Sequence, residues 1–247
     1  MGLLVDLIYT ELLKLKRANM VLVSLLGASA APVIMFIAFL NMKSQKPDTE
    51  ITFSVSFYNT NLNILMLLGV LLYGIITTYL FNREHEENTL KNLLTLPISR
   101  FKFMLSKMIT LYLWIMLLTF FSWMLTLLLG LMGQFEGLSM EVLTNTMQQY
   151  LFGATLMLLM STPTILVVFL TKSYVPTIIF NAVITLSNIT LADSKYRVLF
   201  PWSAVHTIVS HSFVDDYAPI LSYLSILIVS SISFVLATLY FYRLEIR

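Results

Sequence analysis

Residues 108–132 read MITLYLWIMLLTFFSWMLTLLLGLM and contain no Asp, Glu, Lys, Arg or His. An α-helix rises about 1.5 Å per residue and the hydrocarbon core of a bilayer is about 30 Å thick, so about 20 apolar residues make one crossing. Five further stretches have the same character, and they cover residues 18–41, 61–81, 150–171, 174–192 and 218–242. The sequence therefore predicts an all-α polytopic membrane protein with six transmembrane helices.

The composition suits a single transmembrane domain that covers residues 1–247. Of the 247 residues, 58% are hydrophobic and 11% are charged, which lies outside the range of soluble domains. Transporters driven by protons or ions generally keep ionisable residues inside their membrane helices. The six stretches have none, so the energy for any transport must come from elsewhere. The chain also has no Cys, which excludes disulfides and thiolate metal sites.

The basic residues predict the orientation, because Lys and Arg near helix ends favour the cytoplasmic side. With a cytoplasmic N-terminus, eleven basic residues lie inside: Lys14, Lys16, Arg17, Arg83, Lys91, Arg100, Lys102, Lys107, Lys172, Arg243 and Arg247. Four lie outside: Lys43, Lys46, Lys195 and Arg197. We therefore expect a plasma-membrane protein with both termini in the cytoplasm, in which basic charge sets the topology and binds no nucleic acid.

Residues 1–17 precede the first crossing and have an amphipathic pattern. Their apolar and charged side chains fall on different sides of a helix, which predicts a helix on the cytoplasmic membrane surface, anchored by Lys14, Lys16 and Arg17. Two alternatives stay open: an extension of the first crossing, or a signal peptide with a cleavage site near Ala30. The apolar run continues well beyond Ala30, which favours a retained membrane helix.

Residues 193–217 are too polar to cross a bilayer and too apolar for a solvated loop. Lys195 and Arg197 stand close in sequence to Phe200 and Trp202. Aromatic residues next to charges are typical of the membrane interface. We expect one or two short helices here, either lying at the outer interface or re-entering the membrane under the cover of other helices.

The most charged cytoplasmic loop contains the segment 84–98. Its leucines share one side of a helix, acidic residues precede them and a proline ends the pattern: Leu90, Leu93 and Leu94, then Glu84, Glu86 and Glu87, then Pro97. A short amphipathic helix of this kind docks in a groove of a soluble partner. The alternative is an interfacial helix that binds lipid alone.

This loop resembles the coupling-helix region of type-2 ABC exporter permeases. The resemblance rests on Glu84, on the run NTLKNLLTLPISR at 88–100 and on Lys107. It is strongest to the bacitracin-permease-like and lantibiotic-immunity branches. Asn88 stands where the family usually has Gly. The N-terminal helix, the six crossings and the outer segment before the last crossing resemble the family over the whole chain.

The resemblance implies an ATP-driven exporter that works by alternating access. Two such permeases would form a homodimer or heterodimer, and two cytoplasmic ATPase subunits would dock under residues 84–98 and bind ATP and Mg themselves. Members of the family commonly export antimicrobial peptides, peptide toxins or other amphipathic molecules, including lipid-active antibiotics. The segment 195–213 would correspond to the re-entrant helices that cap the pathway.

The resemblance also implies roles for single residues. The ATPase-coupling residues would be Glu84, Glu87, Leu90, Leu93, Leu94 and Pro97. Arg100 and Lys107 would fix the loop to the membrane surface. Residues suited to line or cap the route of an amphipathic substrate are Phe120, Phe121, Trp123, Phe152, Phe180, Pro201 and Trp202, although for any one of the aromatic side chains packing against lipid is the favoured interpretation.

Enzyme chemistry of its own is not expected in this chain. The sequence closest to a phosphate-binding loop, at 69–76, has Ile75 where Lys is required. His206 and His211 are five residues apart, which does not align two metal ligands on a helix, so no metal site is expected. A channel is disfavoured because the crossings offer little polar lining. The alternative to an exporter is a membrane scaffold or sensor that recruits a cytoplasmic partner through residues 84–98.

Overall fold

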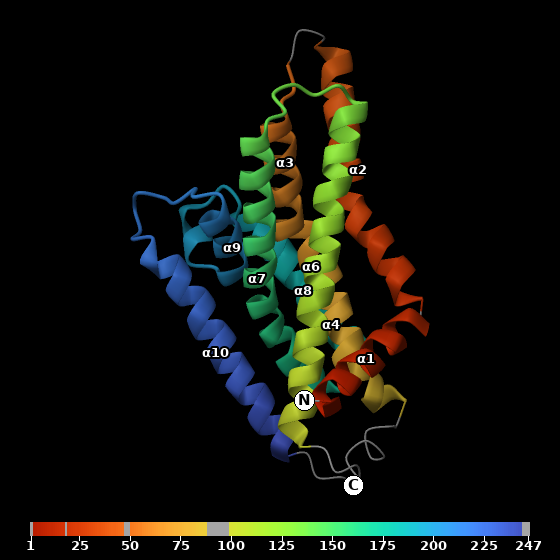
Figure 1. The fold of residues 1–247 in the computed structure, drawn as a ribbon. Helices are drawn as coiled ribbons and strands as arrows, with labels where there is room; N and C mark the ends of the chain where they lie inside the picture. The colour runs from red at the N-terminus through yellow and green to blue at the C-terminus, as the bar shows by residue number, and fades with distance from the viewer. Residues whose placement is uncertain (1, 18, 47–49, 88–98, 244–247) are drawn as a thin grey trace.

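A computed structural model describes residues 2–17, 19–46, 50–87 and 99–243. Within these ranges the chain is helical apart from turns, loops and an isolated bridge between Thr52 and Glu136 (Figure 1). The elements are α1 (Gly2–Arg17), α2 (Met20–Gln45), α3 (Phe53–Asn63), the π-helix η1 (Ile64–Leu68), α4 (Gly69–Glu86), α6 (Arg100–Met132), α7 (Met140–Thr171), α8 (Tyr174–Leu191), the 3-10 helix η2 (Lys195–Val198), α9 (Pro201–Val209) and α10 (Ile220–Arg243).

Six helical stretches in the described ranges are long and apolar enough to cross a membrane. They are α2, the continuous stretch from α3 through η1 to α4, α6, α7, α8 and α10. The prediction of an all-α membrane protein with six transmembrane helices is thus confirmed. The protein is a multi-pass membrane protein.

The helices run in alternating directions and give the bundle two distinct ends. Figure 1 shows α1, the last turn of α4, the first turn of α6 and the last turn of α10 at one end, which we call the basal end. The last turn of α2 and the loop between α6 and α7 lie at the opposite, apical end. The start and the end of the described chain therefore lie at the same end of the bundle.

Several helices are longer than the apolar runs that predict them. The second crossing belongs to a stretch of 34 residues and the third to one of 33 residues. At 1.5 Å per residue each is about 50 Å long, well beyond the 30 Å of the hydrocarbon core. Hydropathy marks the part of a helix at membrane depth, whereas polar caps mark where the helix begins. The hydroxyls of Thr52, Ser99 and Ser139 each accept a hydrogen bond from the backbone N–H three residues on.

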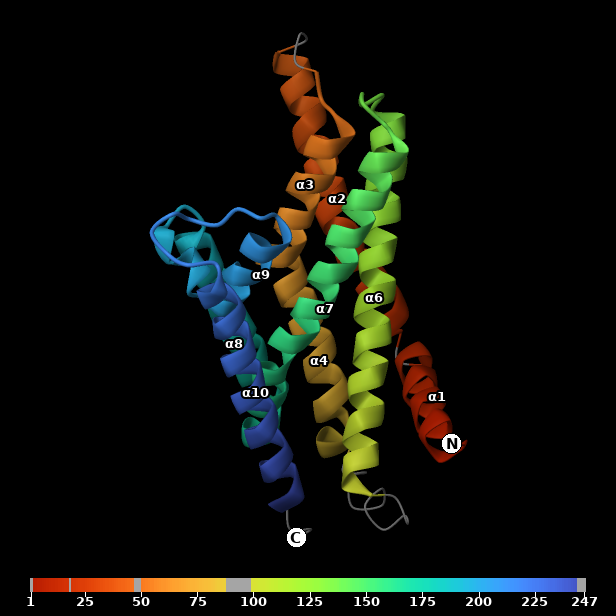
Figure 2. The same cartoon turned by 60° about the vertical axis from the view of Figure 1, so that its left-hand side comes forward.

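The longer helices build an extension at the apical end. Figure 2 shows α2, α3, α6 and α7 rising past the short helix α9 and the apical ends of α8 and α10. Aromatic side chains fill the interior of this extension. The ring of Phe135 lies within 6.2 Å of the rings of Phe36, Phe39 and Phe53. Such pairs of rings stabilise packing beyond their buried area alone.

The break between α1 and α2 bears on one alternative left open by the sequence. Asn19 adopts a left-handed conformation with φ 55°, and α2 begins directly after it. In Figure 1, α1 crosses the basal part of α6 and does not continue along the axis of α2. The segment is therefore a separate helix and not an extension of the first crossing. Its position at the membrane surface stays a prediction.

The second crossing contains a π-turn within its apolar run, at Ile64–Leu68. A π-helix carries one residue more per turn than the regular pattern allows, which frees a backbone carbonyl from its normal partner. Here the amide Nδ2 of Asn188, on α8, donates to the carbonyl oxygen of Met66 within η1 at 2.9 Å. Gly69 follows directly, because a side chain at this position would collide with the backbone of Ile64. This turn was not predicted from the sequence.

Candidate functional site

Four charged side chains meet inside the basal end of the bundle. Glu11 and Lys14 come from α1, Glu84 from the last turn of α4 and Lys107 from α6; we call them the ionic cluster. The Nζ atom of Lys107 lies 2.8 Å from Oε1 of Glu84 and 3.1 Å from Oε2 of Glu11. The Nζ atom of Lys14 lies 2.6 Å from Oε1 of Glu11 and 3.0 Å from Oε1 of Glu84.

The ionic cluster is removed from solvent and is balanced in charge. Glu11, Glu84 and Lys107 are each no more than 3% exposed. Buried charges are tolerated only when they are paired and hydrogen-bonded. The ammonium group of Lys107 also donates to the carbonyl oxygen of Leu80 and lies within 5.8 Å of the ring centroids of Phe81 and Phe103.

Lys14 completes the pairing of the two carboxylates. Burial lowers the pKa of Lys14, but the carboxylates of Glu84 and Glu11 raise it by more, so its pKa lies above the usual value. Lys14 is therefore charged at physiological pH. The cluster then holds two positive and two negative charges, which joins α1, α4 and α6 through a network with no net charge.

Two arginines strengthen the same end. Arg83 Nη1 donates to the carbonyl oxygen of Lys14 at 3.2 Å, and its Nε donates to Oε1 of Glu87 at 2.7 Å. Arg100 Nη1 donates to the carbonyl oxygens of Phe241 and Tyr242 at 3.2 and 2.7 Å. The bond from Arg83 to Lys14 holds α4 to α1, and the bonds of Arg100 hold the start of α6 to the end of α10. The two helices that flank residues 88–98 are thus both tied to other parts of the basal end.

A second polar network supports the short helix α9. The hydroxyl of Ser203 donates to Oδ1 of Asn188 at 2.8 Å, and Nδ2 of Asn188 in turn donates to the carbonyl oxygen of Met66 in the π-turn. The ring of His206 packs edge-on against Tyr58 of α3, with centroids 5.7 Å apart. The helix α9 is therefore seated against α8 and the second crossing.

His206 gives the seat of α9 a pH dependence. Burial, together with the nearby positive charge of Arg197, lowers the pKa of His206 to about 4. In the unfolded chain its pKa is about 6.5, so the unfolded state takes up the proton first as pH falls. The free energy of unfolding is therefore at its full value above about pH 6.5, where His206 is neutral in both states. We expect it to fall by about 2 kcal/mol between pH 7 and pH 5.

The check is the thermal unfolding midpoint of the purified protein in detergent at both pH values. The variant His206→Gln should lose this part of the pH dependence. The matched variant His211→Gln, in an exposed turn, should keep it. Equal pH profiles for the parent and for His206→Gln would contradict the assignment.

The sequence of the chain matches a known family of membrane proteins. Residues 7–188 match the family described as ABC-2 family transporter protein. The chain belongs to the ABC-2 transporter family. This ABC-2 permease is 47% identical over 205 residues to a bacitracin transport permease protein of Bacillus licheniformis, and the match covers 83% of this chain and 99% of the relative. Permeases of this family are membrane transport subunits that normally work with cytoplasmic ATPase partners. The resemblance seen in the sequence is confirmed.

The structure places two predicted site residues of the ABC-2 permease in the ionic cluster. Glu84 is predicted to bind the ATPase, and Lys107 to fix the loop to the membrane surface. Both side chains are turned inward and buried at 2% exposure, because each finds an opposite charge in the ionic cluster, and their roles stay predictions. Lys14, expected as a surface anchor, is also engaged there.

The structure describes some of the remaining predicted site residues of the cytoplasmic side. Glu87 is the exposed acidic residue of the predicted set, with 48% of its side chain accessible. Lys16 and Arg17 are exposed, and Arg100 binds the end of α10. The predicted coupling residues that lie outside the described ranges are Leu90, Leu93, Leu94 and Pro97.

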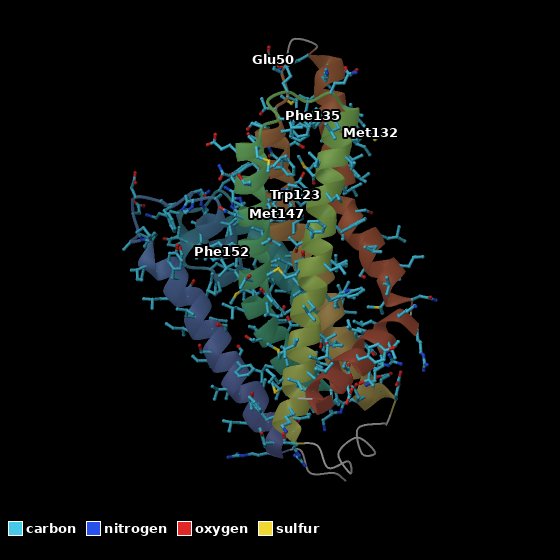
Figure 3. All side chains as sticks on the ribbon, in the orientation of Figure 1. Glu50, Trp123, Met132, Phe135, Met147 and Phe152 are labelled. Carbon is cyan, nitrogen blue, oxygen red and sulfur yellow. The ribbon has the colours of Figure 1, made fainter. Side chains whose placement is uncertain are left out.

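The residues proposed for the substrate route do not form one surface. Trp123 is buried, donates to Thr146 Oγ1 at 3.0 Å and stacks on Phe57, while Phe152 is 46% exposed (Figure 3). Phe120 is also exposed at 43%, and Phe121 is partly buried. A separate group lies at the α8–α9 contact and consists of Phe180, Pro201 and Trp202. Their role in transport stays a prediction.

Sequence reasoning missed two residues of the basal site. Glu11 lies 96 positions before Lys107, and Arg83 was counted only as a topological charge. One signal was present for Glu11, because an acidic residue three positions before Lys14 forms a pair on the same face of a helix. No local signal showed that this pair would meet α4 and α6.

Proposed function

We propose that this chain is the permease subunit of an ATP-driven exporter for amphipathic peptide antibiotics. The observation that carries the proposal is the 47% identity to a permease named for bacitracin transport, over 99% of that protein. In this proposal the basal end faces the cytoplasm of a plasma-membrane protein. Two permeases form a homodimer or heterodimer, and two ATPase subunits dock under residues 84–98 and hold ATP and Mg.

The basal contacts support a route for force from the ATPase. Residues 88–98 connect the end of α4 with the start of α6. The ionic cluster joins both helices to α1, and Arg100 joins α6 to α10. A displacement of the docking segment would therefore move α1, α4 and α6 together. Alternating access requires such concerted motion of several helices around a substrate.

The proposal is tested by purifying the tagged chain from its native membrane in mild detergent. We expect an ATPase subunit to co-purify, and we expect bacitracin or a related amphipathic peptide to stimulate its ATP hydrolysis. A scaffold or sensor, the alternative function, would recruit the ATPase without any response to peptide. A complex that contains no nucleotide-binding subunit would overturn the exporter proposal.

A surface variant tests the docking segment itself. The double substitution Leu93→Asp and Glu87→Lys should weaken ATPase binding at least tenfold. It places a charge among the leucines predicted to share one side of the docking helix, and it reverses the charge of the exposed Glu87. Substitution of Glu84 is unsuitable here, because it would break the ionic cluster. Binding is measured by titrating purified ATPase onto the permease in nanodiscs, with Lys102→Ala as a control outside the ridge. Unchanged affinity of a folded double variant would remove residues 84–98 from the interface.

A further inference from the structure

A crevice of about 410 Å³ opens between the first half of α2 and α6 at Phe121. Its walls are apolar and include Leu22, Leu25 and Leu26 of α2 and Phe121 of α6, while Lys16 and Asn19 lie at its basal mouth. Figure 1 shows α1, α2 and α6 framing this region as a triangle. The crevice lies away from the ionic cluster and shares none of its side chains.

The local structure explains why the crevice stays open. The left-handed turn at Asn19 directs α2 away from α1, and α2 returns to α6 through Ser24 and Ala28. The indole Nε1 of Trp114 donates to the hydroxyl of Ser24 at 3.2 Å, and the hydroxyl of Ser122 donates to the carbonyl oxygen of Ala28 at 2.8 Å. These bonds fix one wall of the crevice, while Leu22 and Leu26 are 61% and 64% exposed on the open side.

The charge at the mouth differs from the charges of the ionic cluster. Lys14 and Lys107 are held by carboxylates, whereas Lys16 at the mouth and Arg17, the next residue of the chain, are exposed and have no ion pair with any residue in the described ranges. The side chain of Asn19 makes no capping hydrogen bond to the first turn of α2 within the same part of the structure. The positive end of the α2 helix dipole adds to the attraction for an anion here.

The length of the crevice matches one leaflet of a bilayer. The part of α2 that lines it runs from Asn19 to Ser29, ten residues or about 15 Å along the helix. Half of the hydrocarbon core is about 15 Å thick. A chain that enters beside Lys16 and runs to Phe121 would therefore reach the middle of the membrane. An apolar crevice with a cation at its mouth matches a lipid that has an apolar tail and an anionic head group.

We propose that the crevice binds one anionic phospholipid from the leaflet at the basal end. Its acyl chain lies along the leucines of α2, and its phosphate contacts Lys16 and Arg17 at the mouth. Basic sites beside membrane helices recognise anionic head groups in this way. A zwitterionic lipid fits the walls but lacks the net charge that matches the two cations. The site is independent of the transported substrate and of the ATPase.

The test uses the full-length protein in nanodiscs made from a mixture of phosphatidylglycerol and phosphatidylcholine. After extraction into detergent, the retained lipid is identified and counted by native mass spectrometry. We expect about one phosphatidylglycerol per chain, enriched over phosphatidylcholine. Neutralising the cations should weaken retention about fivefold for each charge, so the pair Lys16→Ala and Arg17→Ala should lose most of the bound lipid. Lys102→Ala, at an exposed position outside the crevice, is the matched control and should retain it.

A second variant separates a site from surface electrostatics. Leu26→Trp fills the crevice and leaves both cations in place, so it should displace the lipid as strongly as the charge variant. Retention that survives Leu26→Trp would overturn the proposal, as would equal retention of both lipids. Displacement by inorganic phosphate alone would show an anion site without a lipid tail and would overturn it as well.

The absence of Cys from the chain allows a direct check for a competing occupant. A single Leu22→Cys substitution places a unique thiol in the wall of the crevice. Efficient disulfide formation between two copies in one nanodisc would identify a second permease as the occupant and overturn the lipid proposal. Protection of this thiol from a maleimide by phosphatidylglycerol, and less by phosphatidylcholine, is the expected result.

Discussion

Replacing Lys107 by Met is expected to lower the free energy of unfolding by about 3–5 kcal/mol. The substitution keeps an unbranched chain of similar length but removes the charge that both Glu11 and Glu84 approach within 3.1 Å. Only Lys14 then remains for two buried carboxylates. Removing one partner of a buried ion pair is costly, because the charge left behind has lost its solvent and its counterion.

The measurement is the thermal unfolding midpoint of the purified permease in detergent. Lys102→Met serves as the matched control, because Lys102 is exposed in the first turn of the same helix and its loss should change stability by about 0.5 kcal/mol or less. The double variant Lys107→Met with Glu84→Gln restores the charge balance of the cluster. We expect it to recover part of the lost stability, and a double variant less stable than Lys107→Met would contradict the pairing.

The second large effect is expected from Gly69→Ala. A Cβ atom at Gly69 would collide with the carbonyl oxygen of Ile64, which is backbone and cannot rotate away as a side chain does. The π-turn at Ile64–Leu68 would have to change its course, and with it the carbonyl of Met66 that Asn188 binds. Overpacking typically costs about 1–3 kcal/mol, and we expect the upper end of this range because the clash is with backbone.

Gly27→Ala is the matched control for the π-turn. Both glycines lie in apolar membrane helices, but a Cβ atom at Gly27 would meet only the flexible end of Leu72, 2.6 Å from its Cδ1 atom. We expect a change of about 1 kcal/mol or less in unfolding free energy, since the better helix propensity of Ala offsets the shift of Leu72. Equal midpoints for the two variants would show that the π-turn is not a fixed part of the native structure.

The six crossings could be predicted because membrane depth leaves a direct mark on the sequence. A run such as 108–132 has to be apolar over the thickness of the bilayer whatever its neighbours are. The apical ends of the helices left no such mark. Beyond the bilayer a helix is stabilised by caps such as Ser139 and by packing around Phe135, and these contacts depend on residues far apart in the chain.

The ionic cluster was not predicted from the sequence, because it too depends on contacts between residues far apart in the chain. Glu84 and Lys107 stand in the most charged loop region of the sequence, where charges usually face water. Their burial depends on α1, whose Glu11 and Lys14 complete the network from the other end of the chain. Local patterns give the face on which a charge lies, but they do not give its partner at long range. The docking role of the leucines after Glu87 is still carried by pattern and family resemblance alone.

The charge balance of the ionic cluster has a consequence for the response of the protein to voltage. Moving one elementary charge through a membrane potential of 100 mV changes the free energy by about 2.3 kcal/mol. The cluster of Glu11, Lys14, Glu84 and Lys107 carries two charges of each sign, so its movement as a unit transfers no net charge. The ionic cluster itself therefore adds no voltage dependence to a conformational cycle in which it moves as a unit.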